Sequence, residues 1–258
     1  MKKLSALLLV MALLVSLFAL ASCDDKDNDK DKDKDTYIET LAGKSPEELY
    51  QSVKSNLAEA TSYVVDSNQV IVMTYGNEKM TMNQSVVTKV QGDNSYMKSF
   101  NDMTTAANME VWYVDGIIYS NTANGKLQAS MDKEQFMQNY MGKDPSESTL
   151  LDIPESWFEG MKFKQDGEKW VLEITISEEK YEQYFAKLDL GADVDILGDV
   201  QYDIYFDKDG NLEKIITVVD YEIQGVNCHC DTVSNVSLEV VQITPPADAD
   251  SYMQGYIQ

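Results

Sequence analysis

The most reactive cluster in the sequence is "NCHC" at residues 227–230, which contains two of the three cysteines and the only histidine. Thiols and an imidazole are zinc ligands. In a strand, however, residues i and i+2 point to one face and residue i+1 to the other. Cys228 and Cys230 would therefore lie on one face and His229 on the opposite face. No metal site and no cofactor are therefore predicted, and the thiols are expected to be free or joined in a strained disulfide.

Two further patterns suggest chemistry that their spacing does not support. Asp207–Asn211, "DKDGN", is similar to the start of a calcium loop, but Gly210 stands fourth where an EF-hand needs glycine sixth, and a hairpin turn is expected instead. Among the many carboxylates no pair is singled out for glycoside hydrolysis. A lone histidine between two thiols fits no catalytic triad. The sequence predicts no catalytic residue and no enzyme.

The third cysteine, Cys23, stands where an apolar segment meets a charged one. Lys2 and Lys3 precede the apolar run 4–20, and small residues lead into the cysteine, as in an export signal. "LASC" at residues 20–23 resembles the bacterial lipoprotein box. That resemblance implies a diacylglyceryl group on the Cys23 sulfur, cleavage that removes residues 1–22, and attachment to the outer face of the cell membrane. An uncleaved apolar anchor is the alternative.

The charge of the chain restricts its partners. Removal of Lys2 and Lys3 leaves 19 of the 21 lysines against 44 acidic residues, a formal charge of −25. This charge disfavours nucleic acid and anionic lipid surfaces. The chain has no arginine, and therefore no guanidinium group that could bind a phosphate through two parallel hydrogen bonds. Residues 24–35 are seven Asp, four Lys and one Asn, so we expect residues 23–44 to be an acidic disordered tether.

Residues 45–258 have the length and pattern of one domain. Ser45, Pro46 and Glu48 form a predicted capping box that starts a helix. Short β-rich runs with turn signals follow, and Asp115-Gly116 predicts a two-residue hairpin that places Trp112 opposite Tyr119. Strands are predicted at 62–75, 79–90, 95–101, 108–114, 117–121, in a hairpin within 161–176, and at about 199–207, 211–224 and 229–243, and helices within 131–141, 146–160 and 177–190.

These elements predict an α+β fold. Antiparallel strands with one apolar face need a covering layer, and the helices between them are the available partner. We therefore expect a curved antiparallel sheet with helices packed in its concave side. We also expect a monomer.

The chain resembles the LolA/LolB-like superfamily of bacterial lipoproteins, which includes the LppX/LprG group. The resemblance rests on the lipoprotein box, the acidic tether, the Ser-Pro helix start, "YVDGIIY", "YFDKDGNLEKI" and the closing "ITPPADADSY", and it covers about residues 45–252. It implies an unclosed antiparallel β-barrel of about 10–11 strands with helices on its open side. It also implies a lipid or acyl chain held between sheet and helices by a carrier or receptor. A sensing or protein-binding role on the same scaffold is the alternative, which an exposed aromatic patch would favour.

Methionine and aromatic side chains are the candidates for lining such a cavity. The chain has 13 methionines, and flexible thioethers adapt to chains of varying shape. Ordinary core packing is the alternative for every one of these residues. The candidate lining residues, from the central hairpin, its neighbours and the helices expected to face them, are Met73, Met82, Trp112, Tyr119, Phe136, Tyr140, Trp157 and Phe158.

Overall fold

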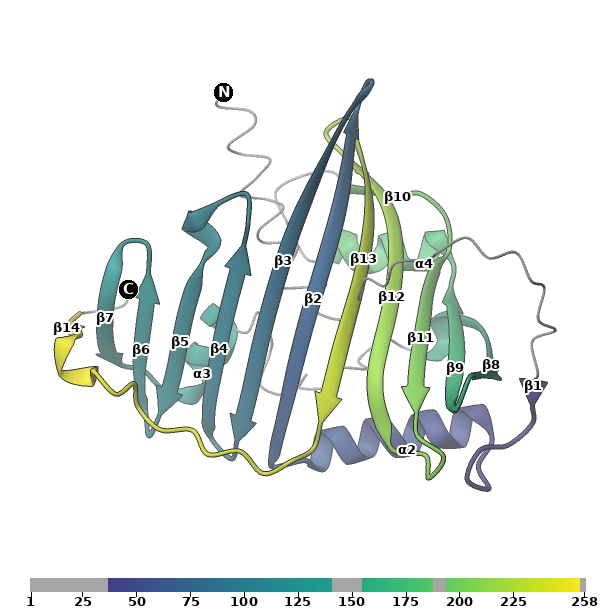
Figure 1. The fold of residues 1–258 in the computed structure, drawn as a ribbon, viewed down its shortest axis with the longest axis horizontal. Coiled ribbons are helices and arrows are strands. Elements are labelled where there is room, and N and C mark those ends of the chain that lie inside the picture. The colour runs from purple at the N-terminus through teal and green to yellow at the C-terminus, as the bar shows by residue number, and fades with distance from the viewer. Residues whose placement is uncertain (1–36, 141–154, 188–193, 256–258) are drawn as a thin grey trace.

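The computed structural model describes residues 37–140, 155–187 and 194–255, which form one large sheet with helices beside it (Figure 1). The helices are α2 (Pro46–Glu59), α3 (Lys133–Tyr140) and α4 (Glu178–Lys187), with short 3-10 turns η1 (Thr105–Ala107), η2 (Glu155–Trp157) and η3 (Ala249–Ser251). The strands are β1 (Tyr37–Ile38), β2 (Ser62–Tyr75), β3 (Glu78–Gln91), β4 (Asn94–Asn101), β5 (Met109–Val114), β6 (Ile117–Thr122), β7 (Gly125–Ser130), β8 (Phe158–Asp166), β9 (Lys169–Ile176), β10 (Val194–Ile196), β11 (Val200–Phe206), β12 (Leu212–Ile223), β13 (Val226–Ser237) and β14 (Met253–Gln254).

The strands make a single open sheet. Their order is β1-β8-β9-β11-β12-β13-β2-β3-β4-β5-β6-β7-β14, with β10 also paired to β12. All pairs are antiparallel except β14 with β7. The expected unclosed antiparallel sheet is confirmed. It has 14 strands, of which β1, β10 and β14 have two or three residues each, and the other eleven agree with the expected number.

Helix α2 begins as its sequence predicts. The Ser45 hydroxyl accepts a hydrogen bond from the Glu48 backbone N–H (3.2 Å), and the Glu48 carboxylate accepts one from the Ser45 N–H (2.9 Å). This capping box satisfies two backbone donors that the first helical turn leaves without partners. Leu49, Tyr50 and Val53 are buried, which fixes α2 across one end of the strands.

The β5–β6 hairpin also forms as predicted. Asp115 and Gly116 have positive φ angles of 50° and 80°, as a type I′ turn requires. Trp112 lies opposite Tyr119 and Val114 opposite Ile117. Asp207–Asn211, the calcium-like pattern, is the β11–β12 turn, in which the Asp207 carboxylate accepts hydrogen bonds from the backbone N–H groups of Asp209 and Asn211 (2.8 and 2.9 Å).

Two predicted boundaries are wrong in the last part of the chain. The final long strand begins at Val226 instead of residue 229, because Gln224 and Gly225 take positive φ angles (53° and 79°) and make the preceding turn. It ends at Ser237, and no strand covers 238–243.

Phe158, expected within a helix, begins strand β8 opposite Ile176. Residues 146–154 of that predicted helical region lie outside the described residues.

The predicted tether is too long at its carboxyl end. Tyr37 and Ile38 pair with Lys164 and Phe163 of β8, and Leu41 is buried in the core. These apolar residues follow the charged run directly, so the fold begins before Ser45. Residues 23–36 lie outside the described part of the chain.

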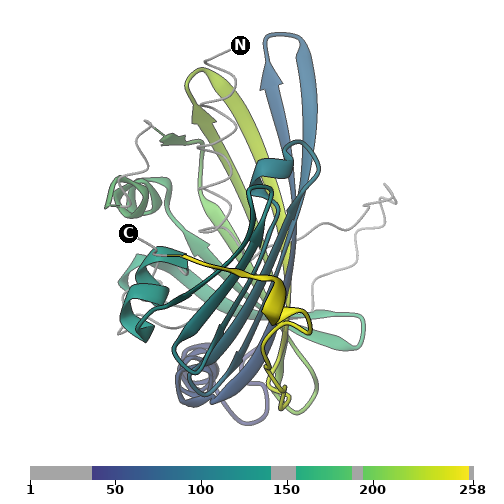
Figure 2. The ribbon, with the colours of Figure 1, turned by 90° about the vertical axis from the view of Figure 1, so that its left-hand side faces the viewer.

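The two faces of the sheet carry different layers. Alternate residues of a strand point to opposite sides. We call the face that packs against α2, α3 and α4 the inner face; in Figure 2 helices α3 and α4 lie on one side of the strands, and the yellow C-terminal segment runs along the other, outer face. In the described ranges, no helix has the length and apolarity needed to cross a membrane.

Candidate functional site

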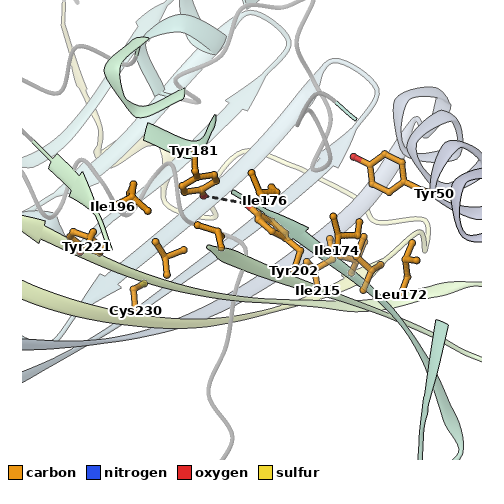
Figure 3. Packing of buried hydrophobic residues seen from close by; sticks show 14 of the residues in the cluster. Tyr50, Leu172, Ile174, Ile176, Tyr181, Ile196, Tyr202, Ile215, Tyr221 and Cys230 are labelled. Carbon is orange, nitrogen blue, oxygen red and sulfur yellow. Dashed lines mark hydrogen bonds between the residues drawn. The ribbon is translucent and has the colours of Figure 1, made fainter. Parts of the chain in front are cut away.

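The inner face carries two buried apolar clusters. The large cluster joins α2, α4 and the strands from β8 to β13 with Ile71, Met73 and Met82 of β2 and β3. Figure 3 shows part of it, with Tyr181 of α4 above the strands and Tyr50 of α2 at one end. The small cluster lies under α3 and consists of Met97, Val111, Tyr113, Ile118, Ala129, Met131 and Phe136.

Each of the three described helices places an aromatic side chain against the inner face. Phe136 of α3 stacks on Tyr113 of β5, with ring centroids 4.6 Å apart. Tyr181 of α4 and Tyr202 of β11 share a hydrogen bond between their hydroxyls (3.1 Å), drawn dashed in Figure 3. Tyr50 of α2 meets the ring of Phe158 edge to face. These contacts lie on both flanks of the central strands β13, β2 and β3.

Five of the candidate lining residues lie on or against these clusters. Met73 and Met82 are 3% and 1% exposed on the central strands, directly within the large cluster. Trp157 and Phe158 are partly buried against the same cluster. Phe136 belongs to the small one. The arrangement places Met73, Met82, Trp157 and Phe158 at one cluster, but it leaves Phe136 in a separate group.

Trp112 and Tyr119 do not face the helices as expected. Their neighbour Val111 points into the small cluster, so Trp112 and its partner Tyr119 point to the outer face. There the ring of Tyr252 meets both, at centroid distances of 6.5 and 5.6 Å. The prediction of their direction is wrong because the register of a hairpin fixes which residues are opposite and does not fix which face is inside.

Two predicted positions are outside the side chains that the structure describes. Tyr140 ends helix α3, and only its backbone is described. Cys23 lies in the segment before residue 37. Their roles remain predictions.

The sequence reasoning missed a group of buried polar side chains on the inner face. We call it the polar belt. Each member is uncharged and less than a tenth exposed, and every member except Ser99 is the cross-strand partner of another member. The polar belt consists of Thr217 of β12, Thr232 and Ser234 of β13, Ser67 and Gln69 of β2, Gln84 of β3, and Ser99 and Asn101 of β4. The signal was present in "DSNQ" at residues 66–69, where polar residues occupy both faces of one strand.

The "NCHC" segment divides between the two faces. Cys228 and Cys230 are free and buried on the inner face, and burial raises the pKa of the Cys228 thiol to about 11 and that of Cys230 to about 12. His229 lies on the outer face, where its Nδ1 is 2.7 Å from the Asp220 carboxylate and its Nε2 is 3.3 Å from Asp231. Among the described residues, no three His, Cys, Asp or Glu side chains are grouped as metal ligands.

Comparisons with known proteins found no matching protein family and no matching curated protein. The chain is similar to solved structures of LprF from Mycobacterium bovis (12% identity, 78% of this chain and 97% of that chain, TM-score 0.34) and of a LolA superfamily protein from Nitrosomonas europaea (11%, 75% and 94%, 0.25). It is also similar to a DUF1329 family protein from Desulfovibrio piger (15%, 81% and 97%, 0.28). The LolA superfamily is the group that the sequence resembles.

We expect His229 to titrate above its ordinary pKa of about 6.5. Partial burial alone would lower the pKa, but the hydrogen bonds and charges of Asp220 and Asp231 outweigh it and raise the pKa. The interaction of protonated His229 with Asp220 and Asp231 therefore stabilises the fold fully below about pH 6.5. This contribution is lost as the pH rises through the folded pKa of His229. The contribution is small because the side chain is 44% exposed.

A proton NMR titration measures this pKa directly, because the chain has one histidine. Asp220→Asn should lower the midpoint, and Asp66→Asn, a change on the outer face of β2, should leave it in place. A wild-type midpoint at or below about 6.5 would contradict the assignment.

We expect the two inner-face thiols to be protected while the chain is folded. With Cys23→Ser as background, both thiols should react with Ellman's reagent at pH 8 at least about 100-fold more slowly than in denaturant, because burial keeps them protonated and out of reach. Asn68→Cys, which adds a thiol on the exposed face of β2, should react at once. Equal rates in the folded and denatured chain would disprove the protection, and two thiols missing in denaturant would indicate a disulfide.

Proposed function

We propose that this domain is a non-enzymatic lipid-binding protein that holds an acyl chain between the inner face of the sheet and its helices. The observation that carries the proposal is the placement of Met73 and Met82 on the central strands, between the flanks where the helices pack. Thioethers adapt to ligands of varying shape at low cost. An acyl chain lying past Met73 and Met82 would contact the apolar side chains of the large cluster.

The arrangement of the helices supports this proposal. Helices α3 and α4 have 8 and 10 residues, and each reaches the sheet through an aromatic contact at one flank, Phe136 on Tyr113 and Tyr181 on Tyr202. A short helix packed on a sheet moves at a smaller cost than a strand within a continuous hydrogen-bonded ladder. Displacement of either helix would admit a chain without breaking the sheet.

We further propose that the chain is exported and anchored to the outer face of the cell membrane by a diacylglyceryl group on Cys23. The support is the order of residues in "LASC" and the apolar run before it. The acidic residues that follow would keep a domain of strong negative charge away from an anionic membrane surface. A tether suits a membrane-bound receptor or a carrier that acts close to the membrane better than it suits a freely diffusing carrier.

The rival proposal, a protein-binding role through an aromatic patch, has weaker support. One aromatic group on the outer face is Tyr96, Trp112 and Tyr119, and Tyr252 packs on the last two. Tyr252 is 4% exposed, and Lys126 forms an ion pair with Asp248 near it. This group is therefore used within the fold by the C-terminal segment.

The lipid-binding proposal predicts uptake of an uncharged acyl probe. The mature chain, residues 23–258 with Cys23→Ser, should bind cis-parinaric acid methyl ester and raise its fluorescence, and native mass spectrometry after purification from a lipid-containing host should show bound acyl species. Met73→Trp should weaken probe binding at least about fivefold, since the added ring occupies inner-face volume.

Val72→Trp is the matched control, because it adds the same ring to the same strand on the outer face. It should leave probe binding within about twofold of wild type, and thermal melts should establish that both variants fold. A wild-type chain with neither co-purified lipid nor probe uptake would refute the proposed function.

The anchor proposal predicts a specific mass. The full chain expressed in a bacterium should lose residues 1–22 and carry a diacylglyceryl group on Cys23, and it should partition with membranes. Cys23→Ser should abolish the added mass, whereas Ser22→Ala, which keeps a small residue before the cysteine, should preserve it. An unmodified mature cysteine, or retention of residues 1–22, would contradict the anchor.

A further inference from the structure

The polar belt crosses the inner face as a continuous row. Thr217, Thr232, Gln69, Gln84 and Asn101 are successive cross-strand partners on β12, β13, β2, β3 and β4. All five side chains are between 1% and 6% exposed. Burying so many polar groups costs free energy unless each group finds a hydrogen-bond partner.

Several members of the belt do find hydrogen-bond partners, within the belt or beside it. The Asn101 amide donates to Gln84 Oε1 (3.0 Å), and the hydroxyls of Ser67 and Ser234 share a hydrogen bond (2.8 Å). Ser99 donates to the Ala107 carbonyl (2.7 Å). The belt is therefore an organised network in which most groups are satisfied.

Gln69, at the centre of the row, is different. Its Nε2 donates to Cys230 Sγ (3.1 Å) and to Thr232 Oγ1 (3.3 Å). Its Oε1 is buried and has no hydrogen-bond partner in the part of the chain that the structure describes. Rotating the amide by 180° does not satisfy both of its ends. The Cys230 thiol and the Thr232 hydroxyl can each donate or accept, so after rotation they would pair with the amide oxygen and the amide nitrogen would be left without a partner.

The surroundings of Gln69 determine what kind of group would satisfy it. Ile71 and Met82 of the large cluster lie on one side along the strands, and Val65 is buried on the other. Every member of the belt is uncharged, and the chain has no arginine. The buried polar side chains that the structure describes are all uncharged, so a buried carboxylate, phosphate or ammonium would find no opposite charge among them. The unpaired amide oxygen suits a neutral donor.

We propose that Gln69, with its neighbour Thr232, binds the free hydroxyl of a neutral acyl lipid, of the acylglycerol class, whose chain runs past Ile71 and Met82. The site is built for this ligand: a donor completes the belt, and the apolar residues along β2 and β3 accommodate the chain. This inference rests on the proposed function and adds to it the chemistry of the lipid's polar end.

The test compares three ligands of one chain length on the mature chain with Cys23→Ser. Their affinities are measured by displacement of cis-parinaric acid methyl ester. 1-Monooleoylglycerol should bind about fivefold more tightly than methyl oleate, as one net hydrogen bond implies, and more tightly than the oleate anion. Gln69→Met, which keeps the length and removes the amide, should bring the ratio of monooleoylglycerol to methyl oleate close to one while methyl oleate binding stays within about twofold.

The control is Asn68→Met, the same kind of change on the exposed face of the same strand, which should retain the preference. The melting temperature provides a second readout. Gln69→Met should stay within about 3 °C of wild type, because it removes an unsatisfied group together with two hydrogen bonds, whereas a purely structural glutamine would lower it further.

Each outcome assigns a failure to one of the two proposals. Equal binding of monooleoylglycerol and methyl oleate by the wild type, tighter binding of oleate, or a preference that survives in Gln69→Met would overturn the role of Gln69 and leave lipid binding intact. The comparison of the three ligands on the wild-type chain needs no variant, so it tests the inference even if Gln69→Met does not fold. Failure of all three ligands and of the probe to bind would instead remove the proposed function itself.

Discussion

The alternation of side chains along one unbroken antiparallel ladder is the constraint on which the whole structure depends. Once β2 and β13 are paired, Met73 and Cys228 must point to the same face, and so must every second residue of both strands. That one choice of face places the helices, the buried thiols and the polar belt on the inner side. It also places His229 and the Trp112–Tyr119 pair on the outer side, where solvent and the C-terminal segment meet them.

The polar belt is a local conflict within an otherwise consistent core. A row of valine or isoleucine across β12, β13, β2 and β3 would extend the large cluster without any requirement for hydrogen bonds. Instead the row carries threonine and glutamine, and the oxygen of Gln69 is left over. Sequences that fold well tend to depart from such consistency at functional sites, where the cost is offset by the ligand. The departure is what makes this part of the inner face more informative than the apolar residues around it.

The turns and helix starts could be predicted from the sequence because their signals are local. Ser45 with Glu48, and Asp115 with Gly116, each contain the full chemistry of a cap or a turn within a few residues. The choice of face has no such signal. In "DSNQ" polar residues alternate with polar residues, so nothing local distinguishes Gln69 from Asn68, and in "VWYV" both faces are apolar. The packing of distant segments decides these cases, as Tyr252 does for Trp112 and Phe136 does for Tyr113.

The surface and the interior of the proposed carrier select against the same lipids by separate physical means. Outside, a charge of −25 on residues 23–258 repels anionic headgroups over about a Debye length, and salt weakens that repulsion. Inside, an uncharged belt without arginine offers no counter-charge to an anionic group that has lost its water, and salt has little effect there. Surface charge acts on approach and the belt on the bound state. A neutral lipid with a free hydroxyl is the class that neither the surface nor the belt disfavours, because its polar end needs only the hydrogen bond that Gln69 leaves open.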